Sequence, residues 1–159
     1  QLNVAAFGET EMKMYLTILR SAMLAVLTLV TANAMAHGDV TPQAVDTSEL
    51  PQLGDEWLTT NPYTGNELAI KIGDSAYNQN CARCHGLEVI SGGITPDLRK
   101  LNDEFEFFSQ EEADGWFMTR IRNGAVVDGR VYMPPFEGIL SQEAMWAIKA
   151  YIETRGVPE

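Results

Sequence analysis

The sequence predicts an all-α fold in which three to four helices are joined by long ordered loops. Cap residues mark three helix starts, after Asn66, after Ser109 and after Ser141. Apolar side chains recur at helical spacing in these segments, and no stretch has the alternation of apolar and polar residues that is typical of a strand. The loops are longer than a bare helical bundle needs, so we expect helices and loops to enclose something large and apolar.

The N-terminal part of the chain is predicted to be a leader that is removed on export. A short basic region ends at Arg20, an apolar stretch covers residues 22–30, and Ala34 to Ala36 has the small-x-small pattern of a cleavage site. The apolar run is shorter than the about 20 residues that cross a bilayer. We therefore expect cleavage after Ala36, a periplasmic protein and no stable membrane insertion.

The mature chain is expected to be one small domain with an irregular extension. Residues 1–36 hold the upstream residues and the signal peptide, residues 37–65 form an irregular N-terminal arm, and residues 66–159 form the domain itself. The arm is predicted to be irregular because it is rich in proline and glycine and lacks helical periodicity.

The formal net charge of the chain is −11. Such an acidic surface is repelled by a phosphate backbone, which argues against nucleic acid as a partner. It is compatible with docking to a positively charged patch on another protein.

The first helix of the domain is predicted to run from Asn66 toward Cys81, with Gly73 in its interior. A glycine there costs about 1 kcal/mol relative to alanine, and the usual reason for one is close approach of another helix backbone. The second helix begins at Ser109 and ends at Gly124, and a loop covers residues 125–139.

The last helix follows Ser141 and places Met145, Ile148 and Ile152 on one stripe. This stripe is the expected face of the helix toward the core.

Cys81, Cys84 and His85 form a C-x-x-C-H motif, which is the signature of covalent haem attachment. On a helical turn both sulfurs lie on one face and can reach neighbouring vinyl groups of one porphyrin, while His85 projects toward the iron. A structural zinc site would need four ligands, and the chain has two cysteines in all. The motif predicts one covalently bound haem c.

The sixth position of the iron has several candidate ligands. Met118 and Met145 lie in predicted helices, where methionine is more often a core residue. Met133 lies in a loop and precedes two prolines, which restrict its backbone. His37, which cleavage would leave at the N-terminus, could instead bind copper. The residues show no set typical of a catalytic site, so we expect an electron carrier rather than an enzyme.

The order of these features resembles that of class I c-type cytochromes. The resemblance covers residues 66–155 and is carried by Gly73, Tyr77, the C-x-x-C-H motif, Pro96-Asp97-Leu98, Met133-Pro134 and the aromatic last helix. It implies the class I cytochrome c fold, with the first and last helices crossing at the glycine and the aromatic residue. It also implies that His85 and Met133 are the axial ligands of the iron. The carbonyl of Pro96 would accept the second ring N–H of His85.

Four stretches, at residues 38–42, 60–63, 77–81 and 129–138, also resemble PedF-type cytochromes, which are related in role to cytochrome c-L of methanol oxidation. This resemblance implies a monomeric carrier that accepts single electrons from a PQQ-dependent methanol or ethanol dehydrogenase. The electrons would pass to a terminal oxidase or another cytochrome. Two alternatives stay open: a generic carrier between respiratory complexes, and a haem sensor or peroxidase with an open iron site.

Overall fold

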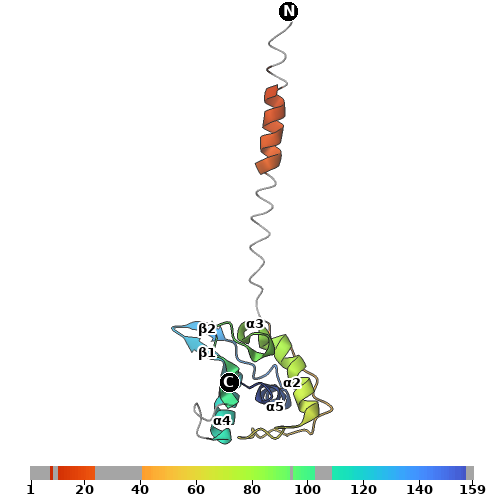
Figure 1. Cartoon of the computed structure of the whole chain (residues 1–159), viewed down its shortest axis with the longest axis vertical. Coiled ribbons are helices and arrows are strands. Elements are labelled where there is room, and N and C mark those ends of the chain that lie inside the picture. The colour runs from red at the N-terminus through yellow and green to blue at the C-terminus, as the bar shows by residue number, and fades with distance from the viewer. Residues whose placement is uncertain (1–7, 9–10, 24–40, 94, 103–108, 157–159) are drawn as a thin grey trace, which may run out of the picture. The chain divides into compact units, whose positions relative to one another are not determined.

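The computed structural model describes residues 8, 11–23, 41–93, 95–102 and 109–156 (Figure 1). The chain divides into two compact units, residues 1–40 and residues 41–159. In the first unit, residues 11–23 are helical and exposed, while Ala36 and His37 lie outside the described residues. None of the helices in the described ranges combines the length and the hydrophobicity that a bilayer span requires.

The second unit is mostly helical, which confirms the predicted fold class. Its main elements are α2 (Glu67–Asn80), α3 (Ala82–His85), η2 (Leu87–Val89), η3 (Leu98–Asn102), α4 (Gln110–Asn123), β1 (Ala125–Val127), β2 (Arg130–Met133) and α5 (Gln142–Glu153).

The three long helices of this unit begin at the predicted caps. The side chains of Asn66, Ser109 and Ser141 each accept a hydrogen bond from the backbone N–H three residues further on, at 3.0, 3.2 and 3.2 Å. Each bond satisfies one of the amide groups that the first turn of a helix leaves without a partner. Helix α4 ends at Gly124, where φ is +67°, a value that glycine adopts without strain.

Helices α2 and α5 cross at the predicted glycine. A Cβ atom on Gly73 would lie 1.9 Å from the carbonyl oxygen of Ala147, so only glycine allows this approach of the two backbones. One turn further along α2, the rings of Tyr77 and Tyr151 pack with their centroids 5.3 Å apart. The crossing therefore depends on the absence of a side chain at Gly73 and on the aromatic pair one turn further along.

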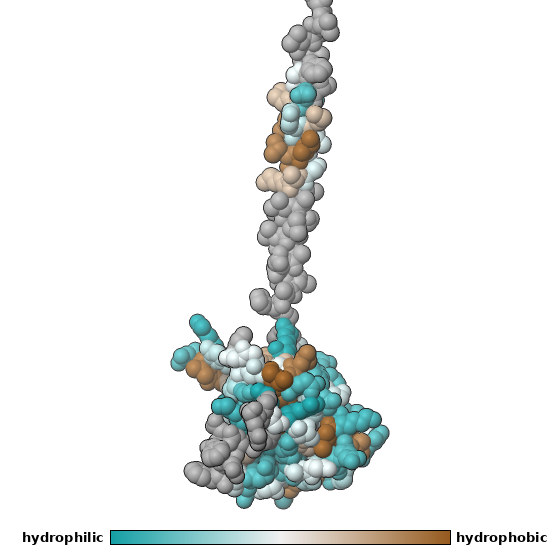
Figure 2. Space-filling view, viewed as in Figure 1, coloured by the Kyte–Doolittle hydropathy of each residue, from teal (hydrophilic) through white to brown (hydrophobic). Residues whose placement is uncertain are grey.

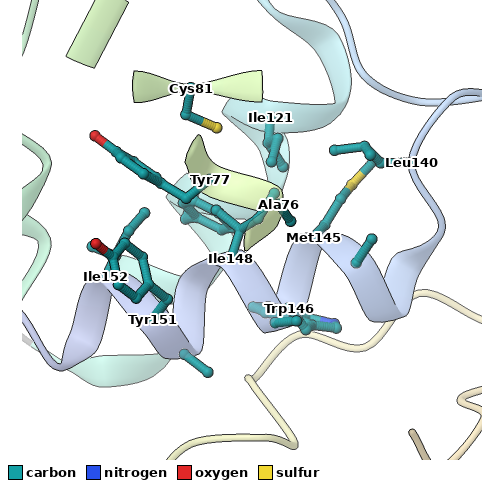
Figure 3. Packing of buried hydrophobic residues seen from close by; sticks show 14 of the residues in the cluster. Ala76, Tyr77, Cys81, Ile121, Leu140, Met145, Trp146, Ile148, Tyr151 and Ile152 are labelled. Carbon is teal, nitrogen blue, oxygen red and sulfur yellow. The ribbon is translucent and has the colours of Figure 1, made fainter. Parts of the chain in front are cut away.

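Helix α5 lies at the centre of the core (Figure 3). Met145, Ile148 and Ile152 are fully buried, as the predicted stripe requires, but so are Trp146 and Ala147 on other sides of the helix. The stripe is thus only part of the buried surface. The elements around α5, including the arm, cover the side of this helix that would face solvent in an ordinary amphipathic helix.

A hairpin stands where the sequence analysis expected only loop, so that expectation was wrong for residues 125–133 (Figure 1). Strands β1 and β2 pair antiparallel, with Val126 opposite Val131. The turn residues Asp128 and Gly129 have φ values of +50° and +75°. Positive φ at both central positions is the geometry of the tight turn that suits the twist of a hairpin, and Asp-Gly favours it.

The part of the arm that the structure describes, residues 41–65, contains neither helix nor strand, as predicted. Four of its backbone N–H groups instead donate hydrogen bonds to side chains of α2, α4 and α5. The pairs are Gln43 with Asn80 (2.6 Å), Leu53 with Glu143 (2.8 Å), Leu58 with Gln142 (2.7 Å) and Asn61 with Asp114 (2.7 Å). These contacts fix the arm to the helices.

A buried group of charges lies beneath the arm. Lys149 is completely buried, and its Nζ atom lies 3.3 Å from Asp114 and 3.0 Å from Glu153. Asp114 also accepts hydrogen bonds from the N–H of Asn61 and from the side chain of Gln110. Charges in an interior need such partners because water no longer solvates them.

Candidate haem site

The C-x-x-C-H motif forms the predicted helical turn. The N–H of Cys81 donates to the carbonyl of Tyr77 at 2.7 Å, and the N–H of His85 donates to the carbonyl of Cys81 at 2.9 Å. The motif thus continues from α2 into the short helix α3, which holds Cys84 and His85. The helical register that haem attachment requires is present in the backbone.

The two cysteines differ in their surroundings. Cys81 is buried, Cys84 is exposed, and the two form no disulfide. Burial, assisted by the nearby Cys84, raises the pKa of the Cys81 thiol to about 12. A sulfur in this position is disfavoured as a thiolate, whereas a thioether bond to a haem vinyl group carries no charge and suits the buried position.

His85 is oriented by the loop that follows it. Its Nδ1 atom lies 3.2 Å from the carbonyl oxygen of Pro96, so the structure brings these two predicted site residues together. With the proton on Nδ1 donated to this carbonyl, Nε2 is available to a metal ion. Burial lowers the pKa of His85 although the bond to Pro96 opposes the shift, which favours the neutral ring that metal ligation needs.

Thr95 is a member of the site that the sequence analysis did not identify. Its hydroxyl donates to the carbonyl of Cys84 at 2.7 Å, and its own carbonyl accepts from Ser91 at 2.6 Å. These bonds tie the segment that carries Pro96 to the C-x-x-C-H turn. In the sequence, the one signal for Thr95 was its position next to Pro96, because no spacing pattern marks a loop threonine as part of a site.

The loop directly after His85 is also held tightly. A Cβ atom on Gly86 would lie 1.9 Å from the carbonyl oxygen of Ile90, and its φ is +82°. The Tyr77 hydroxyl donates to the carbonyl of Gly86 at 2.9 Å, and Arg155 forms an ion pair with Glu88 at 2.6 Å. The loop is therefore anchored to both α2 and the end of α5.

Met133 is the last residue of β2 rather than a loop residue. It is partly buried and packs against the core cluster. The backbone after it lies against Gly124, where a Cβ atom would be 2.3 Å from the carbonyl oxygen of Met133. Met118 and Met145 are buried at 5% and 0% exposure within the core.

The residues around the motif fit a haem. The motif combines an imidazole with two sulfurs at attachment spacing, and Met133 supplies a thioether from β2. Large apolar side chains are exposed in the loop after His85, namely Leu87 and Ile90, and on the hairpin, including Val131 and Tyr132. In Figure 2 apolar surface gathers on the hairpin and beside α3. Among the residues that the structure describes, no group of three or more His, Cys, Asp or Glu side chains could hold a bare metal ion.

A helical fold with a C-x-x-C-H turn and a hydrogen-bonded histidine defines a protein that binds haem covalently. A family model described as cytochrome C oxidase, cbb3-type, subunit III, matches residues 68–152. The chain belongs to the class I c-type cytochromes. It carries haem c, and it is an electron carrier rather than an enzyme.

Curated relatives extend this assignment. The chain is 52% identical over 146 residues to cytochrome c550 of Pseudomonas aeruginosa, a match that covers 89% of this chain and 97% of that protein. It is 34% and 33% identical to the quinohemoprotein alcohol dehydrogenases ADH-IIG and ADH IIB of Pseudomonas putida, over 59% of this chain and 12% of each of those proteins. No solved structure matches the chain.

Proposed function

We propose that this cytochrome accepts single electrons from a PQQ-dependent alcohol dehydrogenase, with methanol or ethanol as the alcohol, and passes them to a terminal oxidase or another cytochrome. The observation that carries the proposal is the likeness to a segment of two quinohemoprotein alcohol dehydrogenases. The names of those proteins combine a quinone and a haem with alcohol oxidation. A separate chain that resembles this segment is suited to accept electrons from an alcohol dehydrogenase as its partner protein.

In this proposal the chain supplies every group that holds the haem. Cys81 and Cys84 form the thioether bonds, His85 and Met133 ligate the iron, and the Pro96 carbonyl orients His85, as its 3.2 Å distance from Nδ1 supports. The bound haem supplies a one-electron couple. The residues around it keep both ligands in place, so that the protein changes little between the two oxidation states.

The remaining parts of the proposal concern export and docking. Residues 1–36 are the upstream residues and signal peptide, and the periplasm is the compartment of the mature monomer. Its net charge of −11 favours a partner with a basic docking patch. The association rate should therefore fall as salt is added.

Stopped-flow reduction tests the partner. The ferric cytochrome is mixed with a purified PQQ-dependent dehydrogenase and its alcohol, and the haem absorbance is followed at low and high salt. Fast reduction that needs the alcohol and slows with salt is expected. Reduction no faster than in the mixture without alcohol would exclude this class of partner.

Met133→Ala tests the sixth ligand. The variant is expected to lose the near-infrared band of methionine-ligated ferric haem and to have a lower reduction potential, because a methionine ligand raises the potential. Met118→Leu, a change within the core, is the control and should keep the band. A band that persists in Met133→Ala would refute the assignment in favour of another methionine, whereas a wild type that lacks the band would favour the open-site alternative.

A further inference from the structure

Arg122, in the last turn of α4, joins two segments that are far apart in the chain. Its guanidinium carbon lies 4.0 Å from the ring centroid of Trp57 in the arm. Its Nε and Nη2 atoms donate to the two carboxylate oxygens of Glu137 at 3.1 and 3.0 Å. The ion pair is thus a two-pronged contact of fixed geometry, with an aromatic ring stacked on the cation.

The ring of Trp57 is placed by the residues on either side of it. The N–H of Leu58 donates to the side-chain oxygen of Gln142 at 2.7 Å, and the side-chain nitrogen of Gln142 donates to the carbonyl of Glu56 at 3.0 Å. Gln142 is only 7% exposed. One buried amide therefore fixes the backbone both before and after the tryptophan.

Glu137 belongs to the segment that carries Met133. Phe136 is buried, and its N–H donates to the carbonyl of Ile121 at 3.0 Å. The N–H of Glu137 donates to the carbonyl of Arg122 itself at 3.4 Å. Both the backbone and the side chain of Glu137 are held by the end of α4.

Two prolines, at positions 134 and 135, connect Met133 to this anchored end. Each proline fixes its own φ angle, so the connection has little freedom to absorb movement. A shift of Glu137 is therefore passed on to Met133 rather than lost in a flexible loop. The close approach of Gly124 to this segment leaves no space for it to move toward α4.

We propose that Arg122 is a positioning residue, which couples the arm through Trp57 to the Met133 segment through Glu137 and so holds the methionine on the iron. The inference rests on the proposed role of Met133 as the sixth ligand. It gives the arm a part in the ligand site, in addition to covering the core.

Binding of imidazole to the purified ferric cytochrome measures how often Met133 leaves the iron, because only the open form binds it. Arg122→Gln should bind imidazole with an apparent Kd about tenfold lower than that of the wild type and should show a weaker near-infrared band. Trp57→Leu and Glu137→Gln should shift both readouts in the same direction. Arg122→Lys, which keeps the charge but not the two-pronged contact, should fall between Arg122→Gln and the wild type.

Arg120→Gln is the matched control. Arg120 lies on the same helix, with its guanidinium carbon 5.4 Å from the ring of Trp116. Its variant should bind imidazole like the wild type, since neither its contact with Trp116 nor its long hydrogen bond of 3.4 Å to the carbonyl of Gly124 involves Trp57 or Glu137.

The outcomes separate the two proposals. If Met133→Ala keeps the band, the ligand assignment fails and the coupling fails with it. If Met133→Ala loses the band but Arg122→Gln binds imidazole like Arg120→Gln, the ligand assignment stands and the coupling is overturned. Should Arg122→Gln fail to fold, the same comparison of Trp57→Leu and Glu137→Gln with the control decides the matter.

Discussion

Replacement of Gly73 by alanine offers a direct test of the helix crossing. The added Cβ would lie 1.9 Å from the carbonyl oxygen and 2.5 Å from the carbonyl carbon of Ala147. Ordinary contact is about 3.5 Å, so one helix must move by more than an ångström. The obstacle is backbone, which cannot rotate away as a side chain can.

The expected loss of stability follows from two opposing effects. Overpacking of this kind costs about 3 kcal/mol, the upper end of the usual range. Alanine in a helix interior recovers about 1 kcal/mol relative to glycine. We therefore expect Gly73→Ala to lower the free energy of unfolding by about 2 kcal/mol.

Gly115→Ala is the control because it makes the same chemical change in α4. A Cβ at Gly115 would have no neighbour within 4 Å, so this variant should gain up to about 1 kcal/mol. Guanidinium unfolding of both holoproteins, followed by far-ultraviolet circular dichroism, measures the difference. If the two variants differ by less than about 0.5 kcal/mol, the crossing does not require glycine and the reasoning is refuted.

Two further predictions concern the buried charges and the arm. Lys149→Met leaves Asp114 without its cation and should cost about 3 to 5 kcal/mol in the same unfolding assay; unfolding like the wild type would show that the charge pair is not needed. Burial by itself raises the pKa of Glu143. The hydrogen bonds that its carboxylate accepts, chiefly from the N–H of Leu53, together outweigh this effect, so the pKa lies below its usual value. Glu143 therefore contributes stability that is present above its unfolded pKa of about 4.3 and is lost as the pH falls through its lower folded pKa. The stability advantage of the wild type over Glu143→Gln should shrink on acidification, and an advantage independent of pH would contradict this.

Local signals explain which parts of the fold could be predicted from the sequence. The caps Asn66, Ser109 and Ser141 act within three residues of their own position, and the C-x-x-C-H spacing sets its geometry within one turn. Gly73 is informative because its cost in a helix demands a compensating contact. The hairpin had a local signal too, in Asp128-Gly129 between valines, but its strands are too short to show alternation.

The attachment of the arm could not be predicted in this way. The hydrogen bonds from Asn61, Leu58 and Leu53 reach partners 53, 84 and 90 positions away. They join backbone amides to ordinary polar side chains, for which no sequence spacing exists. The contact of Arg122 with Trp57 and Glu137 escaped prediction for the same reason, since arginine and glutamate on a surface are usually solvated.

The dependence of the arm on side-chain acceptors has a consequence for engineering. A shortened cytochrome that starts at Asn66 would retain the C-x-x-C-H motif and Met133. It would lack the N–H groups of the arm that donate hydrogen bonds to Asp114, Gln142 and Glu143. Water would replace the arm as the partner of these acceptors, and the net loss of each hydrogen bond is about 0.5 to 1.5 kcal/mol, against a total stability of about 5 to 15 kcal/mol for a small domain. Trimming at the boundary that the motifs suggest would remove part of the interior, so a minimal carrier would need new partners for these three side chains.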